Sequence, residues 1–241
     1  MDTHALCSRI RATARRITPA AVRTELWCWI VIEAGFFLWA LAIVLRVQAN
    51  LGLGPWDVFH VGLARIVGVS LGRIIQIVGL AVIVASYLFA RIKPGWGTLG
   101  NMVFIGIFID WIMPHVPKMH SLPAELAMLI GGIVLTGPAT AIYFSAGLGA
   151  GPRDSLMLAL ARTSGWSIRS IRVAIELTVL AAGALMGGKV GFGTVLAALG
   201  SGPAIQVFLR LMRVEGASRK PAFPWPCREP AHAPARARGG H

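Results

Sequence analysis

The sequence contains little charge for its length. Only 14% of its 241 residues are charged and 56% are hydrophobic, whereas ordinary soluble domains carry about 25% charged residues. The mean hydropathy is +0.69. So few charges cannot cover a water-soluble surface unless most of the chain lies in lipid. The composition therefore excludes a disordered protein, argues against a soluble enzyme and predicts a membrane protein.

Cysteine is scarce, and the motifs of common catalytic sites are absent. The three cysteines, Cys7, Cys28 and Cys227, include no close pair, which excludes a cysteine-based zinc site. The six histidines show no metal-ligand spacing, and the chain has no H-E-x-x-H, P-loop, G-x-S-x-G or dinucleotide-binding motif. We therefore expect no catalytic residue, no metal and no cofactor. A membrane enzyme that assembles its site from distant spans stays an open alternative.

Long apolar runs dominate what is present. A helix needs about 20 mainly apolar residues to cross the hydrocarbon core of a membrane. Two segments, residues 54–67 and 151–164, are too short and too charged to span. Six segments are candidate spans: residues 26–47, 74–90, 98–113, 126–146, 170–186 and 194–212. We therefore predict an all-α, polytopic membrane bundle with six transmembrane helices and two short re-entrant or interfacial helices.

Basic residues are in excess, and their positions report orientation. The formal net charge is +13, and positive charge in short loops marks the cytoplasmic side. With six spans this rule places both termini in the cytoplasm. An eight-span arrangement moves Arg91 and Lys93 outside and gives a weaker bias. Because topology accounts for the basic residues, we expect membrane lipids as partners and no nucleic acid.

This arrangement divides the chain into three parts. Residues 1–25 form a basic cytoplasmic tail, residues 26–213 form the transmembrane domain, and residues 214–241 form a disordered basic tail that is rich in proline, alanine and arginine. Such a composition lacks the periodic apolar residues that a packed core needs.

The transmembrane domain contains one pattern twice. Residues 49–70 and 146–167 are identical at 11 of 22 positions with an offset of 97, and the block Gly95-Trp96-Gly97-Thr98 recurs as Gly191-Phe192-Gly193-Thr194. The identities include proline, aspartate and arginine, so shared hydrophobicity does not explain them. Each copy reads span, short helix, span, span, which gives repeat one at residues 26–117 and repeat two at residues 122–213.

The number of spans in each copy predicts how the copies are oriented. Three is an odd number, so the second copy enters the membrane from the opposite side. This is the inverted repeat found in many secondary transporters.

Both copies contain the motif L-G-x-G-P-x-D, at residues 51–57 and 148–154. Together with the later G-x-G-T blocks, this motif resembles the YczE/YyaS/YitT family of bacterial integral membrane proteins. The resemblance covers residues 26–213, which is everything except the tails. It implies a multi-pass protein of the bacterial cytoplasmic membrane, and it carries over no catalytic residue.

Each copy of the motif has the residues that begin a helix. Pro55 and Pro152 suit the first helical position, where a missing N–H costs nothing. Asp57 and Asp154 then fall in the first turn, where a carboxylate faces the positive helix end. Glycines precede each proline and allow unusual backbone angles and close helix approach; they are Gly52, Gly54, Gly149 and Gly151. A capped, tightly packed helix start explains the motif structurally.

A second interpretation of the motif uses the symmetry. Two short helices, one from each repeat, would bring their N-termini toward a common midplane, where free N–H groups make an anion site. The carboxylates of Asp57 and Asp154 repel an anion unless they are protonated, and otherwise suit a cation or a proton-coupled step. The sequence leaves these alternatives open.

Charged residues inside spans are further candidates for a substrate or ion site, because they are costly in lipid. Glu33 lies about two turns into the first span and has no local partner. Asp110 lies near the outer end of the third span. A packed interhelical contact for Glu33 and an interfacial position for Asp110 are the structural alternatives. Glu176 follows Arg172 by four residues, which predicts a structural ion pair on one helix face.

Glycine–proline pairs occur inside two later spans. Gly137-Pro138 lies in the fourth and Gly202-Pro203 in the sixth. Proline removes an intrahelical hydrogen bond and kinks a helix, and the freed carbonyl needs protein or a watery cavity to receive it. These pairs predict helix breaks, with either packing kinks or a cavity near Gly137 and Ser201.

Three functions remain, in order of preference. The first is a secondary transporter of a small solute or ion, with Asp57, Asp154 and Glu33 at a central site. The second is a non-transporting scaffold or regulator that acts through its tails. The third is a membrane-embedded enzyme. The sequence indicates neither a substrate nor an oligomeric state.

Overall fold

The computed structural model describes residues 19–145 and 151–212, and the regular structure in these residues is helical. The predicted C-terminal tail and residues 1–18 lie outside the described residues. The helices are α2 (Pro19–Ala49), α3 (Pro55–Val67), α4 (Leu71–Ala90), α5 (Trp96–Ile112), the 3-10 turn η1 (Met113–His115), α6 (Leu122–Ser145), α7 (Pro152–Ser164), α8 (Ile168–Leu185) and α9 (Phe192–Leu211).

The helices follow the predicted segments. Apart from the start of α2, which lies seven residues before Leu26, every helix end lies within four residues of its predicted boundary. Five helices, α2, α4, α5, α6 and α9, are long and apolar enough to cross a membrane. The predicted all-α, polytopic membrane bundle is therefore confirmed. The sixth span stays a prediction, because α8 carries Arg169, Arg172 and Glu176 within its 18 residues.

The surface of the bundle fits a lipid environment. Large apolar side chains lie exposed on the helices that can span, among them Leu88, Phe89, Val195, Leu199 and Leu211. Soluble monomers rarely expose apolar surface on this scale. The main buried cluster is formed by α2 and α5, with Tyr143 near the end of α6, so most of this cluster lies within the first half of the domain.

Corresponding helices of the two halves begin and end in the same way. Gly68 and Gly165 end α3 and α7 in the left-handed conformation, with φ of 73° and 72°. Ser70 and Ser167 then cap α4 and α8 by accepting a backbone N–H from the residue three positions on. Before α5 and α9, the N–H groups of Gly95 and Gly191 donate to Thr98 and Thr194.

The first helices of the two halves, α2 and α6, cross in antiparallel orientation. A Cβ on Gly35, early in α2, would lie 3.1 Å from Cγ2 of Ile142, late in α6. A Cβ on Gly132, early in α6, would lie 2.8 Å from Cγ of Arg46, late in α2. Gly35 and Gly132 are 97 residues apart, which is the offset of the sequence repeat. Each half therefore places a glycine at the equivalent point of the crossing.

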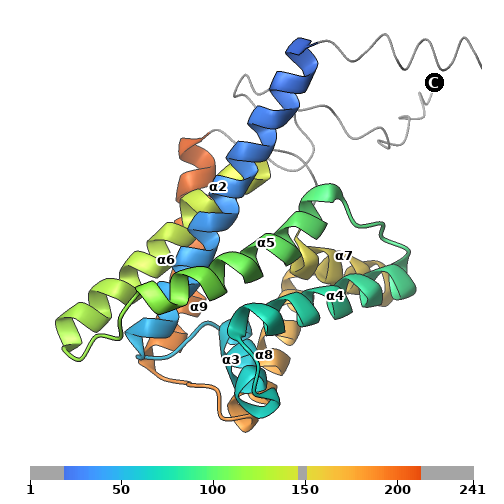
Figure 1. Ribbon diagram of the computed structural model, residues 1–241. Helices are drawn as coiled ribbons and strands as arrows, with labels where there is room; N and C mark the ends of the chain where they lie inside the picture. The colour runs from blue at the N-terminus through green and yellow to red at the C-terminus, as the bar shows by residue number, and fades with distance from the viewer. Residues whose placement is uncertain (1–18, 146–150, 213–241) are drawn as a thin grey trace, which may run out of the picture.

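The remaining helices pack in a crossed pattern between the halves (Figure 1). The short helix α3 packs against α8, and the short helix α7 packs against α4. Within the halves, α2 packs against α5 and α6 against α9. One contact lacks a counterpart, because α4 packs against α5 whereas α8 and α9 make no comparable contact in the described residues.

The glycine–proline pairs do not interrupt their helices. Helix α6 continues through Pro138 and α9 continues through Pro203, so the helix breaks expected at Gly137-Pro138 and Gly202-Pro203 are absent. Each proline removes one hydrogen bond, but the turns on both sides remain helical. Gly137 serves close packing instead, since a Cβ there would lie 2.7 Å from the Ala204 carbonyl oxygen of α9.

Candidate functional site

A cavity of about 330 Å3 lies between the two halves of the transmembrane domain. Residues from α2 to α9 line it, and the first turns of both short helices, α3 and α7, are part of its wall. We call it the central cavity. Its polar and charged lining includes Arg46, Asp57, His60, Thr136, Tyr143, Arg153, Asp154, Arg172, Glu176 and Ser201.

The first turns of α3 and α7 have the same local geometry. Their N-cap residues, Gly54 and Gly151, share a φ of −61° and have ψ of 157° and 164°, and a proline follows each. The carboxylates of Asp57 and Asp154 turn back over these glycines. A Cβ on Gly54 would lie 3.5 Å from Asp57 Oδ2, and a Cβ on Gly151 would lie 3.6 Å from Asp154 Oδ2. The motif therefore begins a helix in both halves, as the structural interpretation predicts.

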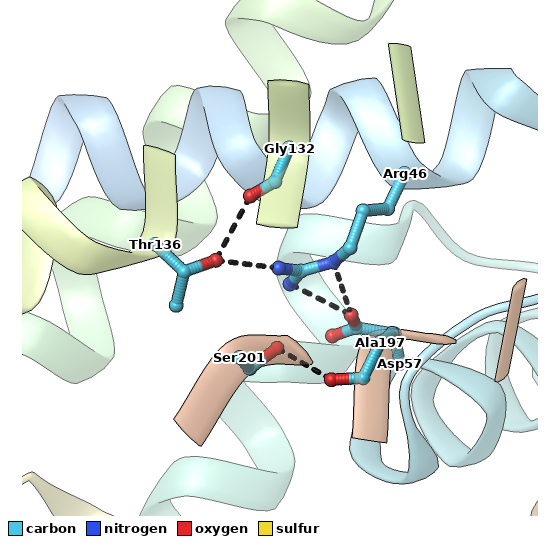
Figure 2. A network of polar contacts seen from close by, with 6 residues as sticks. All are labelled: Arg46, Asp57, Gly132, Thr136, Ala197 and Ser201. Atoms are coloured by element: carbon cyan, nitrogen blue, oxygen red, sulfur yellow. Dashed lines mark hydrogen bonds and ion pairs between the residues drawn. The ribbon is translucent and has the colours of Figure 1, made fainter. Parts of the chain in front are cut away.

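In the first half, Asp57 is held by a buried arginine (Figure 2). Arg46 Nη2 lies 2.9 Å from Asp57 Oδ2, and Arg46 Nε donates to the same oxygen at 3.2 Å. Arg46 Nη1 donates to Thr136 Oγ1 at 2.8 Å, and that hydroxyl donates to the carbonyl of Gly132. This network joins α2, α3 and α6, and it satisfies the buried guanidinium with a carboxylate and a hydroxyl.

In the second half, the corresponding acid forms no ion pair with an arginine that the structure describes. The offset of 97 places Tyr143 at the position of Arg46. Tyr143 and Asp154 both line the central cavity. Among the described residues, no cationic side-chain atom lies within 4.0 Å of the Asp154 carboxylate. Two equivalent carboxylates therefore have different surroundings.

The variable position of the motif connects the two halves directly. Trp56 in the first copy corresponds to Arg153 in the second. The guanidinium carbon of Arg153 lies 4.8 Å from the centroid of the Trp56 ring, a cation–π contact. Because these equivalent residues touch one another, side chains from the first turns of α3 and α7 meet at the interface between the halves.

Helix α8 and the later part of α3 complete the charged and polar wall. Arg172 Nε donates to Glu176 Oε1 at 2.9 Å, which confirms the ion pair predicted from their spacing. His60 is only 2% exposed, and its Nδ1 has no hydrogen-bond partner among the described residues. Ser201 lines the cavity from α9, one turn beyond Ala197, whose carbonyl its hydroxyl binds at 2.7 Å (Figure 2).

The structure places the other two acidic candidates away from the central cavity. Glu33 lies early in α2, where both carboxylate oxygens are buried without a hydrogen-bond partner in the described residues. Asp110 accepts hydrogen bonds from the Ser70 hydroxyl at 2.6 Å and the Gly72 N–H at 2.8 Å, so it ties the end of α5 to the start of α4. Neither residue lines the cavity.

Gly52, the first glycine of the motif, lies in close contact with the start of α9. Gly52 has a φ of 116°, and a Cβ there would lie 2.8 Å from the backbone nitrogen of Gly191. It thus needs to be glycine both for its backbone angle and for the close approach of α9. Its counterpart Gly149 lies outside the described residues. In the described part of the chain, no cluster of three His, Cys, Asp or Glu residues could hold a metal ion.

Several cavity residues are not among the site residues predicted from the sequence. In the sequence, Arg46 is a single charge at the end of the first predicted span. The structure buries its guanidinium against Asp57, 11 residues later. Trp56 and Arg153 occupy the one position of the inner G-P-x-D motif that differs between the copies. That difference between two equivalent helix starts is the signal that identifies them.

The comparisons with known proteins agree with this fold. Residues 26–210 match the model of a family of unknown function, DUF6198. The chain is 39% identical over 175 residues to "Uncharacterized membrane protein YczE" of Bacillus subtilis (strain 168), which covers 72% of this chain and 81% of the relative. It is 32% identical over 207 residues to an "Uncharacterized protein" of Haemophilus influenzae, which covers 84% of this chain and 92% of the relative.

A more distant relative completes the assignment. "Uncharacterized protein YyaS" of Bacillus subtilis (strain 168) is 27% identical over 181 residues, which covers 74% of this chain and 90% of the relative. No solved structure matches the chain significantly. The matched residues coincide with the transmembrane domain, and the predicted resemblance to YczE and YyaS is confirmed. The chain is a membrane protein that belongs to the DUF6198 family.

Proposed function

We propose that the protein is a secondary transporter that binds a small solute in the central cavity, between two halves that face opposite sides of the membrane. The observation that carries the proposal is the meeting of equivalent helix starts, one from each half, at a single charged cavity. In secondary transporters with inverted repeats, the substrate site lies at the interface of the repeats and is built from partial helices.

The antiparallel crossing of α2 and α6 supports opposite orientation of the two halves. These helices are equivalent by the sequence offset, and the early part of each contacts the late part of the other. Two copies related by an axis along the membrane normal would place such helices parallel. An axis in the membrane plane makes them antiparallel, which is the relation in an inverted repeat.

Contacts between helix ends support the six-span topology. That topology places the ends of α2 and α5 and the starts of α4 and α9 on the outer side. These ends do contact one another, through Gln48 with the Val116 carbonyl, Ser70 with Asp110, Lys189 with Asn50, and the Gly193 N–H with the Leu51 carbonyl. A topology that separated these ends across the membrane would be incompatible with such contacts.

The difference between the halves also suits alternating access. Helices α4 and α5 pack together, whereas α8 and α9 both line the central cavity without a comparable mutual contact. A transporter alternates by moving one repeat relative to the other around a fixed site. We infer that the alternate state exchanges these two arrangements, so that α8 closes on α9 and α4 separates from α5.

The test is solute flux into vesicles that contain the full-length protein. A panel of radiolabelled small zwitterions, anions and cations is compared with vesicles that lack the protein. Val82→Trp, which fills the cavity from α4, is expected to abolish the flux. Val84→Trp is the matched control on the same helix, because Val84 is 47% exposed on the outer surface and does not line the cavity.

Two results would contradict the proposal. The first is flux equal to that of empty vesicles for every solute, and the second is equal flux through both tryptophan variants. If deletion of residues 215–241 abolishes a cellular phenotype that Val82→Trp leaves intact, the protein acts through its tail as a scaffold or regulator.

A further inference from the structure

The charged side chains of the central cavity balance in sign. Among the residues that the structure describes, three guanidinium groups and three carboxylates line it, from Arg46, Arg153, Arg172, Asp57, Asp154 and Glu176. With all six ionised, their charges sum to zero. A ligand with a net charge would therefore add an uncompensated charge to a site that is partly removed from water, and such burial is costly.

Four of the six charged groups are paired with one another. Arg46 and Asp57 form one pair at 2.9 Å, with side chains only 7% and 5% exposed. Arg172 and Glu176 form the other pair at 2.9 Å, one turn apart on α8. The first pair connects α2 to α3, and the second connects two successive turns of α8. They leave Arg153 and Asp154 as the charged groups available to a ligand.

Arg153 and Asp154 are adjacent in the first turn of α7, and neither forms an ion pair in the described part of the chain. Among the described residues, neither has an oppositely charged atom within 4.0 Å. The guanidinium of Arg153 lies over the face of Trp56, and this contact uses none of its five N–H donors. The cavity therefore presents one available cation and one available anion side by side.

We propose that the central cavity binds a small zwitterion, with its anionic group on the Arg153 guanidinium and its cationic group on the Asp154 carboxylate. The inference rests on the transporter function proposed above and names the substrate class of that site. A guanidinium binds a planar or tetrahedral oxyanion through parallel N–H bonds, and a carboxylate accepts the N–H bonds of an ammonium group. Each end of the ligand then takes the place of an ion-pair partner that the described residues do not supply.

The rest of the cavity suits a short ligand. Its volume of about 330 Å3 lies at the lower end of the usual range of ligand sites, about 300–1,000 Å3. Val78, Val82, Ile105 and Met157 supply apolar wall for the segment between the two charged ends. The unpartnered Nδ1 of buried His60 supplies a further polar atom that a bound ligand or its water would satisfy.

The experiment measures binding to the purified full-length protein in lipid nanodiscs. The probes are glycine, 3-aminopropanoate, 4-aminobutanoate and 5-aminopentanoate, which differ in the separation of their charges. Each is compared with an alkanoate and an alkylamine of the same chain length. At least one zwitterion is expected to bind more tightly than both of its singly charged analogues, by a factor on the order of ten or more, since each charge-assisted hydrogen bond contributes about 1.5–3 kcal/mol.

Two variants separate a ligand contact from a structural role. Arg153→Gln is expected to weaken zwitterion binding and to leave a preference for the alkylamine, because Asp154 remains. Asp154→Asn is expected to weaken it and to leave a preference for the alkanoate. Arg153→Lys keeps the charge and should retain the zwitterion preference. Arg162→Gln on α7 and Glu125→Gln on α6 lie outside the cavity lining and serve as controls for charge and folding.

The outcomes distinguish this inference from the proposed function. If singly charged probes bind as tightly as the zwitterions and are transported, the substrate class is wrong and the transporter stands. If both substitutions weaken all probes equally, without the reciprocal change of preference, the assignment of the two ends is overturned. If no probe binds and none shows flux, both the inference and the transporter proposal are contradicted.

Discussion

In the first half of the transmembrane domain, Arg46 holds Asp57 at 2.9 Å, and Thr136 binds the same guanidinium. In the second half, Tyr143 takes the position of Arg46, and Asp154 has no cationic partner within 4.0 Å among the described residues. The two carboxylates nevertheless begin equivalent helices with nearly equal backbone angles. The two helix starts thus share their backbone framework, whereas the charged groups around them differ.

This difference is the basis of the proposed binding role. Asp57 completes a buried network that joins three helices, so its carboxylate is already used in an ion pair. Asp154 has the same backbone geometry and lines the same cavity, but it forms no ion pair among the described residues. Equivalent or analogous residues should therefore respond differently to the same kind of substitution.

The largest expected difference is between the two motif aspartates. Asp57→Asn should lower the free energy of unfolding by about 3–5 kcal/mol, because it leaves the buried Arg46 guanidinium without its counter-charge. Asp154→Asn should lower it by less than about 1 kcal/mol, as for substitutions that break no buried pair. Denaturant titration of the purified variants in detergent measures both. Equal losses would remove the distinction between a committed and an available carboxylate.

The crossing of α2 and α6 gives the next comparison. Gly132→Ala should cost about 1–3 kcal/mol by overpacking, since its Cβ would lie 2.8 Å from the Ala42 carbonyl oxygen, which cannot move without the helix. Gly35→Ala should cost less, because its closest contact, at 3.1 Å, is a methyl group of Ile142. The same unfolding titration tests this order, and a reversed order would contradict the crossing as described.

Two serine caps allow a smaller comparison. Ser70→Ala and Ser167→Ala each remove an N-cap, which typically costs about 1 kcal/mol. Ser70→Ala should cost more, because the Ser70 hydroxyl also donates to Asp110 at 2.6 Å. Among the residues that the structure describes, the hydroxyl of Ser167 contacts Ser170 alone, on the helix that it caps. Asp110→Asn in the Ser70→Ala background should lower the free energy of unfolding only slightly further. If the two losses are fully additive, the two side chains act independently.

The smallest effect concerns the ion pair on α8. Arg172 and Glu176 are 53% and 31% exposed, so a double-mutant cycle should give a coupling energy of only about 0.3–0.5 kcal/mol. The same cycle on Arg46 and Asp57 should give a coupling several times larger. Comparable couplings for the two pairs would mean that burial does not distinguish them.

The helices of this fold could be predicted from the sequence, because local signals determine where they begin and end. Apolar runs set their lengths, and Ser70, Ser167 and the glycine–proline starts mark their N-termini. The charged network could not be predicted in this way. Arg46 meets Thr136, 90 residues away, only because α2 and α6 cross, and the sequence shows Arg46 as a charge at the end of an apolar run.

Glu33 illustrates the same limit of local reasoning. Its isolation within an apolar span suggested the central site, but the part of α2 that lines the cavity is its later half, with Trp39, Ile43 and Arg46. Position along the helix, which only packing determines, separates it from the site. The glycine–proline pairs show a related limit, since the loss of one hydrogen bond does not interrupt a helix whose neighbouring turns remain packed. Ser201, next to the second pair, does line the central cavity.

The central claim, that the two halves face opposite sides of the membrane, is tested most directly at Lys93 and Lys189. These residues are exposed and occupy equivalent positions, two residues before Gly95 and Gly191. Each is changed to cysteine in a protein from which Cys7, Cys28 and Cys227 have been removed, and a membrane-impermeant thiol reagent is applied to right-side-out and inverted vesicles. Labelling of position 93 only from the cytoplasmic side and of position 189 only from the outer side is the predicted result. Labelling of both positions from the same side would contradict the account.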